Sequence, residues 1–168
     1  MMDRRLFVFG AGAAMCLAGC SSFVPKGATS PAGATRDVVL EKINEVRAAN
    51  GNGLKPLHYD VRLEAAARRQ AELMAARDRV AHDLGVGLKQ RVNEAGYFQS
   101  VGENLAGGQQ TLEQAIAGWL KSSSHRATML SPIYTEFGFA VVTRPNTKWR
   151  VFWATIYGGP TEGYFKTP

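Results

Sequence analysis

The sequence predicts an α+β domain built as a three-layer α-β-α sandwich with a central antiparallel sheet. Two patterns carry this prediction. Apolar residues recur at helical spacing in several segments between residues 37 and 122, whereas residues 137–142 and 151–157 are apolar in the manner of strands. Because a strand that is apolar on both faces must be covered on both faces, the helices are expected to provide that cover.

The composition fits one globular domain. The chain has 168 residues, 45% of them hydrophobic, which excludes disordered, collagen-like and multi-domain classes. Its 20 basic and 14 acidic residues are scattered, so the charge of +6 does not predict nucleic-acid binding. Both cysteines, Cys16 and Cys20, lie within the first twenty residues. The rest of the chain therefore has no disulfide framework, zinc knuckle or thiol nucleophile.

Residues 1–19 are typical of a secretory signal. Arg4 and Arg5 precede the uncharged run of fourteen residues from Leu6 to Gly19. As a helix this run would span only ~21 Å, which is short of the ~30 Å hydrocarbon core of a bilayer, so a cleaved segment is favoured over a spanning helix. The arginine pair is also similar to a twin-arginine export signal, and the choice between the two export routes stays open.

Cys20 is the predicted lipidation site. The sequence Leu17-Ala18-Gly19-Cys20 resembles the lipobox of bacterial lipoproteins, which implies cleavage before Cys20 and attachment of diacylglycerol to its sulfur. Several acyl chains hold a protein stably on a membrane. Ser21 resembles the outer-membrane sorting preference of Gram-negative lipoproteins. We therefore expect a protein anchored in the cell envelope and facing the periplasm or the exterior; the alternative is a released protein in which Cys20 has no role.

A flexible tether is expected over residues 20–36, followed by the domain over residues 37–168. Twelve of the seventeen tether residues are Gly, Pro, Ser, Thr or Ala, and they show no apolar periodicity. A coil of this length reaches roughly 20 to 25 Å. Without residues 1–19 the chain keeps 18 basic and 13 acidic residues, a net charge of +5 that could favour anionic headgroups or wall polymers.

Four helices are predicted before the strands. The first ends at Asn50 with a glycine-type C-cap, and the second begins after the N-cap Asp60. A shorter helix covers residues 88–95. The fourth begins at Thr111, which forms a capping-box pattern with Gln114, and stops in the serines 122–124.

Two strands are predicted after the helices. They cover residues 137–142 and 151–157, and the turn over residues 143–149 should pair them antiparallel. No phosphate-binding loop, His-Glu-x-x-His helix or Gly-x-Ser-x-Gly elbow occurs, so nucleotide hydrolysis and α/β-hydrolase chemistry lack their usual sequence support.

Six separated motifs together resemble one family. They are Ile43-Asn44-Glu45-Val46-Arg47, Leu57-His58-Tyr59-Asp60-x-x-Leu63, Ala81-His82, Gly102-Glu103-Asn104-Leu105, the segment from Trp119 through Ser122 and His125 to Leu130, and Thr135-Glu136-Phe137-Gly138. In order and spacing they are similar to the CAP superfamily (cysteine-rich secretory proteins, antigen 5 and pathogenesis-related proteins) in its disulfide-free bacterial form. The resemblance covers about residues 38 to 158.

The resemblance implies a cleft with two histidines and two acidic residues. The matching positions are His82, Glu103 and His125. Where many eukaryotic members carry the second acid, this chain has Ser122, so the set of four is incomplete. Glu136 is an acidic residue nearby in sequence and is the remaining candidate for the cleft.

These residues suit a metal or ligand site. Neutral imidazoles bind zinc or copper, so His82 and His125 are the expected metal ligands, and a divalent ion such as zinc is the cofactor to consider. Glu103 could orient one imidazole or act as a general base on bound water, which makes it the candidate catalytic residue. Glu103 could equally be a structural carboxylate that accepts backbone N–H groups from its own loop. Asn104 is expected to be structural, and His58 is interpreted as a partly buried residue without a role.

Three functions remain open. The first is a non-enzymatic, envelope-tethered module that binds a ligand, a metal or a cell-wall component in the cleft. The second is a metal-assisted hydrolase of envelope substrates. The third is a lipid or sterol carrier, although the aromatic residues fit a core better. We expect a monomer and no nucleic-acid partner. Eight of the chain's aromatic residues are the candidates for lining a lipid groove: Tyr97, Phe98, Trp119, Phe139, Trp149, Phe152, Trp153 and Tyr157.

Overall fold

The structure is a computed structural model that describes residues 29–51 and 53–161. The expected export segment, Cys20 and the first part of the tether lie outside the described residues. Within the described ranges, no helix has the length and apolar character needed to cross a membrane. Every helix, strand and core residue named below falls between residues 29 and 161, so a chain that starts at Ser21 retains all of them.

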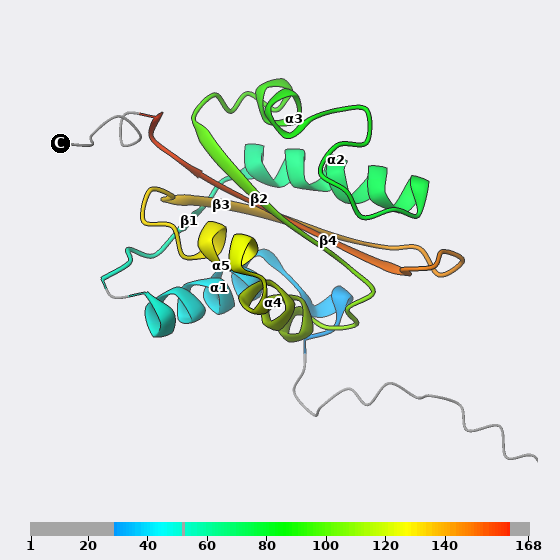
Figure 1. The fold of residues 1–168 in the computed structure, drawn as a ribbon, viewed down its shortest axis with the longest axis horizontal. Helices are drawn as coiled ribbons and strands as arrows, with labels where there is room; N and C mark the ends of the chain where they lie inside the picture. The colour runs from blue at the N-terminus through cyan, green and yellow to red at the C-terminus, as the bar shows by residue number, and fades with distance from the viewer. Residues whose placement is uncertain (1–28, 52, 162–168) are drawn as a thin grey trace, which may run out of the picture.

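The fold is a four-stranded sheet between two layers of helices, as Figure 1 shows. The strand order is β1-β3-β4-β2, with α2 and α3 on one face and α1, α4 and α5 on the other. This confirms the predicted three-layer sandwich. The elements are η1 (Pro31–Gly33), α1 (Arg36–Asn50), β1 (His58–Tyr59), α2 (Val61–Arg77), α3 (Leu88–Glu94), β2 (Ser100–Gly107), α4 (Leu112–Lys121), α5 (Ser123–Met129), β3 (Glu136–Thr143) and β4 (Val151–Gly159).

The centre of the sheet is the predicted antiparallel hairpin of β3 and β4. All nine residues of β4 are buried, as expected for a strand covered on both faces. Phe152, Ala154 and Ile156 pack under α2, whereas Trp153 and Tyr157 pack among the residues of α1 and α4. One pairing departs from the expected antiparallel sheet, because the two residues of β1 run parallel to β3.

The starts of α2 and α4 follow the predicted capping chemistry, because Asp60 and Thr111 accept hydrogen bonds from backbone N–H groups of the first turn of these helices. Thr35, which the sequence analysis did not name, caps α1 in the same way. The prediction of a glycine-type C-cap for α1 is wrong in the conformation of the glycine. Gly51 is extended, with φ −129°, and closes the helix by donating to the carbonyl of Arg47.

Four elements of the described fold are absent from the sequence analysis: η1, β1, β2 and α5. The segment around Glu103 was expected to be a loop, yet it forms the edge strand β2, because eight residues pair with β4 even though Gly, Glu and Asn have low strand propensity. The serines were expected to end a helix. Only Ser122 does so, with extended ψ of 124°, and Ser123 then begins α5.

The packed part of the chain begins earlier than the expected boundary at Asp37. The backbone N–H and the hydroxyl of Thr29 donate to the carboxylate of Glu113, at 2.9 and 2.8 Å. The carbonyl of Thr29 accepts from the N–H of Leu112 at 2.9 Å. The last eight residues of the expected tether, from Thr29 to Arg36, are therefore part of the domain edge beside α4.

A glycine in β3 lets α2 approach the sheet closely. A Cβ atom at Gly138 would overlap the backbone of Leu63 and Glu64 in the first turn of α2. These are backbone atoms and cannot rotate away, so the close contact between α2 and β3 depends on glycine at this position.

We expect Gly138→Ala to lower the free energy of unfolding by about 1–3 kcal/mol, because the added methyl overpacks the contact with α2. Gly118→Ala is the matched control. Gly118 lies in α4 with open space around its Cβ position, so alanine there should raise stability by roughly 0.5–1 kcal/mol through helix propensity. Urea unfolding of both variants measures the difference, and equal shifts would contradict the packing argument.

Candidate functional site

The candidate site lies on β2, the edge strand of the sheet. Successive side chains of a strand point to opposite faces. Leu105 packs with the residues of α2, and Ala106 packs with those of α1 and α4, so Glu103 faces the α2 side and Asn104 the α5 side. The neighbours Glu103 and Asn104 therefore contribute one polar side chain to each face of β2 at the same point along the strand.

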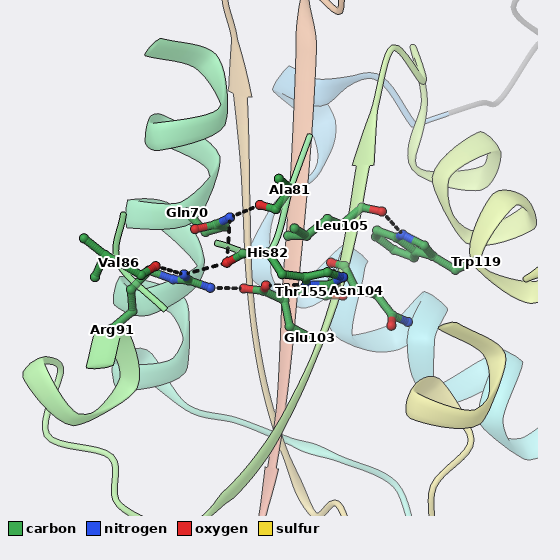
Figure 2. Close-up of polar contacts among 10 residues, drawn as sticks. All are labelled: Gln70, Ala81, His82, Val86, Arg91, Glu103, Asn104, Leu105, Trp119 and Thr155. Carbon is green, nitrogen blue, oxygen red and sulfur yellow. Dashed lines mark hydrogen bonds and ion pairs between the residues drawn. The ribbon is translucent and has the colours of Figure 1, made fainter. Parts of the chain in front are cut away.

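The carboxylate of Glu103 is buried and fully engaged. Its side chain is 1% exposed. One oxygen, Oε1, accepts from Nη2 of Arg91 in α3 at 2.5 Å, and the other, Oε2, lies 2.9 Å from Nδ1 of His82 (Figure 2). The alternative interpretation, in which Glu103 accepts backbone N–H groups of its own loop, is wrong, because both carboxylate oxygens bind side chains. Removing one partner of such a buried pair costs about 3–5 kcal/mol, because the other charge is left uncompensated.

The loop that carries His82 is fixed from two helices. Arg91 donates through Nη1 to the carbonyls of His82 and Val86, at 3.2 and 2.6 Å. Gln70 in α2 donates to the carbonyl of Ala81, as Figure 2 shows. The position of the imidazole thus depends on Arg91 twice, once through the loop and once through Glu103.

Asn104 fixes the helix that carries the second histidine. Its side chain is fully buried, and Nδ2 donates to the backbone carbonyl of His125 at 2.8 Å. The backbone carbonyl of Asn104 accepts from the hydroxyl of Thr155 in β4 at 3.2 Å. The expected structural role of Asn104 agrees with these contacts, although it acts from a strand rather than from an irregular loop.

The two imidazoles meet at the edge of β2. The ring centroids of His82 and His125 lie 6.5 Å apart, with an angle of 51° between the ring planes. His82 comes from the α2–α3 loop on one face of the sheet, and His125 comes from α5 on the other. The side chain of His82 is 60% exposed, so the pair is open to solvent.

The pKa values of the two histidines move in opposite directions. The hydrogen bond to Glu103 raises the pKa of His82 above the usual 6.5, against the opposing effects of burial and Arg91. Burial, followed by the nearby charge of His82, lowers the pKa of His125 below 6.5. Around neutral pH, His125 is therefore the less protonated of the two.

Glu136 lies apart from this cluster. Its carboxylate accepts from the hydroxyl of Tyr97, and it lines a pocket of about 330 Å³ with Arg62 and Phe98, whose lining does not include His82 or His125. The separation follows from the sheet, because Glu136 stands on β3, two strands away from β2. The expectation that Glu136 joins the cleft is not supported by this placement.

Ser122 supplies no carboxylate to the cluster, and His58 lies on the opposite edge strand of the sheet from β2. Ser122 joins α4 to α5 and lies 3.2 Å from the hydroxyl of Ser124. His58 is exposed on β1 rather than partly buried, which corrects the sequence interpretation.

The cluster can hold a divalent ion only weakly. Two imidazoles that share one zinc ion at about 2.0–2.1 Å have ring centroids roughly 5–6 Å apart, so the observed separation is close to that geometry. Among residues 29–51 and 53–161, however, no group of three or more His, Cys, Asp or Glu side chains is placed to hold a metal. The residues present fit an open two-histidine site, in which Glu103 orients His82 without touching the ion.

The aromatic residues serve mainly as core. Trp149 is half-buried and Phe98 is 69% exposed. The others are almost completely buried, which agrees with the interpretation that their spacing fits packing: Tyr97, Trp119, Phe139, Phe152, Trp153 and Tyr157.

Two residues that build the site were missed in the sequence. Arg91 and Gln70 are polar residues placed on the apolar stripes of α3 and α2, beside Val92 and Ala71, and both are at most 1% exposed. A charged or amide side chain on an apolar stripe is the signal that could have identified them, because such a side chain must find a partner when it is buried.

Comparison with known proteins gives a consistent result. The family model described as the cysteine-rich secretory protein family matches residues 40–157. The uncharacterized protein YkwD of Bacillus subtilis is 30% identical over 118 residues, which are 68% of this chain and 45% of that protein. The uncharacterized membrane protein YlbC of the same organism is 32% identical over 61% of this chain and 30% of its own length. The chain thus spans less than half of each of these curated relatives.

Solved structures share the fold. An extracellular protein containing an SCP domain from Bacillus anthracis aligns with a TM-score of 0.64 and 22% identity, over 73% of this chain and 39% of its own. An outer surface protein from Borrelia burgdorferi aligns with a TM-score of 0.65 and 23% identity, over 74% of this chain and 91% of its own. At these identities the likeness concerns the fold alone.

We expect His82 to titrate above pH 6.5 and His125 below it, as followed by NMR of the imidazole resonances. Glu103→Gln should lower the pKa of His82, because it removes the negative charge at Nδ1. Protonation of His82 stabilises the wild-type fold below the unfolded pKa, and this contribution is lost as the pH rises through the raised value. The control is Glu45→Gln, an exposed change in α1. An unchanged His82 titration in Glu103→Gln would refute the assigned cause.

Proposed function

The chain belongs to the cysteine-rich secretory protein (CAP) family, and we propose that it is a non-enzymatic, envelope-tethered module that binds a ligand through the imidazoles of His82 and His125. The engagement of Glu103 supports this proposal most directly. Its carboxylate binds Arg91 and Nδ1 of His82, so Nε2 is the ring nitrogen of His82 that remains to face a ligand. A partner with donor or metal-binding groups would meet two imidazoles held from opposite faces of the sheet.

Binding fits these contacts better than hydrolysis. A general base must lie within about 3 Å of the proton that it takes, or one water away. Glu103 does reach His82, but both of its oxygens are already engaged and its side chain is almost completely buried. A catalytic zinc site also needs three protein ligands, and the described residues supply two imidazoles. Glu103 is therefore assigned as the residue that orients His82.

A divalent ion is the simplest ligand to test. His82 and His125 would hold it, and a zinc ion bound in this way would offer free coordination positions to oxygen or nitrogen donors of a cell-wall component. The hydrogen bond from Nδ1 to Glu103 fixes the tautomer and the orientation of His82, as carboxylates do for metal-bound histidines.

The proposed location is the cell envelope, with the chain held by acylated Cys20. Three observations support it: the lipobox-like Leu17-Ala18-Gly19-Cys20, the extracellular protein of Bacillus anthracis and the outer surface protein of Borrelia burgdorferi among the proteins of similar fold.

The metal version is tested by calorimetry with zinc and copper on the chain that starts at Ser21. We expect measurable binding, which is abolished by His82→Ala combined with His125→Ala. Glu103→Gln should weaken the binding roughly 10- to 100-fold, the usual effect of removing a carboxylate that orients a metal-binding histidine. His58→Ala, which removes an exposed histidine elsewhere, should leave it unchanged. If the heat of metal binding persists in the double variant, the proposed binding of a metal by His82 and His125 is wrong.

Anchoring is tested in cells that export the full chain. With a palmitate analogue as label, we expect the wild type to be labelled and to fractionate with membranes. Cys20→Ser should lose the label, whereas Cys16→Ser, which changes the other cysteine of the same segment, should keep it. If the wild-type chain is not labelled, the proposed anchoring is wrong and the protein is released rather than tethered.

A further inference from the structure

One end of the molecule carries a cluster of unpaired basic residues. These residues come from the C-terminal end of α2 and from the β3–β4 turn, and all five are exposed. None of them forms an ion pair within residues 29–51 and 53–161, whereas six of the other eleven basic residues there do. We call this cluster the basic end: Arg77, Arg79, Arg144, Lys148 and Arg150.

The basic end is held in a fixed arrangement. The carboxylate of Asp78, at the end of α2, accepts from the backbone N–H groups of Lys148 and Trp149, at 2.6 and 3.3 Å. In the other direction, Arg144 donates through Nη1 to the carbonyl of Ala75 in α2 at 3.1 Å. Asp78 thus lies among the five basic residues, and its acceptor oxygens serve to attach the turn to the helix.

The start of the described chain is connected to the β3–β4 turn through the segment after β2. The N–H of Gly108, just after β2, donates to the carbonyl of Val151 at the base of the turn, at 2.9 Å, and Trp149 lies against the same glycine. Four residues further on, Leu112 donates to the carbonyl of Thr29 at 2.9 Å. In Figure 1 the blue segment at the start of the described chain lies beside α4, on the opposite side of the sheet from α2.

The length of chain between Cys20 and Thr29 limits how far the domain can stand from an anchor. The two positions are nine residues apart, and nine residues span at most about 30 Å when fully extended. An acylated Cys20 would therefore keep the domain, and with it the basic end, close to the membrane surface.

We propose that the basic end docks on the anionic phospholipid headgroups of the membrane that holds the anchor. Basic residues near an anionic surface each strengthen binding by a factor of about five. Trp149, half-buried beneath the ammonium of Lys148 at 5.1 Å, adds an amphipathic ring of the kind found at membrane interfaces. The argument rests in part on the anchoring proposed above, but the contact itself is a property of the folded domain.

The test uses the chain that starts at Ser21, which lacks Cys20, so that failure of the anchor and failure of the docking surface are separate results. Sedimentation with vesicles of phosphatidylcholine, with and without phosphatidylglycerol, measures the binding. We expect binding only to the vesicles that contain phosphatidylglycerol, and we expect it to weaken as salt is added.

Two variants of equal net charge locate the surface. Arg79→Gln, Lys148→Gln and Arg150→Gln together should weaken binding roughly 100-fold. The control combines changes at three exposed lysines outside the basic end and should bind nearly as well as the wild type: Lys55→Gln, Lys89→Gln and Lys121→Gln.

Three outcomes would overturn the proposal. Equal weakening in the two variants would mean that net charge alone, rather than this surface, determines the binding. Failure of the wild type to bind phosphatidylglycerol vesicles would remove the membrane as the partner. Retention on dextran sulfate without vesicle binding would instead indicate a polyanionic wall polymer. Circular dichroism of both variants verifies that they are folded.

Discussion

The buried ion pair of Arg91 and Glu103 is the contact on which the rest of the site depends. A carboxylate that is almost completely removed from water must be compensated, and Arg91 supplies that charge from α3. The same guanidinium binds two carbonyls of the loop before α3, so one side chain fixes both the acid and the loop that presents His82. The second oxygen of Glu103 then sets the orientation of the imidazole.

An edge strand makes this arrangement possible. Because side chains alternate along β2, the neighbours Glu103 and Asn104 reach opposite layers of helices. Glu103 positions His82 from one layer, and Asn104 positions His125 from the other. On a central strand, the strands on both sides would keep residues of the two helix layers apart. Because β2 is an edge strand, the imidazoles of His82 and His125 can approach each other past its free edge. Glu103 and Asn104 have low strand propensity, but they are the polar residues that the site requires on this strand.

Local patterns in the sequence were enough to predict most of the scaffold. Four helices and the β3–β4 hairpin follow from periodicity and capping, and the family resemblance named His82, Glu103 and His125. The patterns failed where long-range contacts decide the structure. β2 exists because it pairs with β4, and β1 exists because it pairs with β3. Arg91 and Gln70 stand on apolar stripes, so their importance became visible only when their partners were known.

By itself, the sequence determined that helices with an apolar face and strands that are apolar on both faces must be buried against one another, and hence that helices cover a sheet on both sides. It also determined which side chains are able to act as ligands, since that is a matter of chemical type. Only the tertiary structure decided which of those side chains meet: it brought His82 to His125 and put Glu136 two strands away. The physical reason is that periodicity records the face on which a residue lies, whereas proximity across the fold depends on strand order and register, which no local pattern encodes.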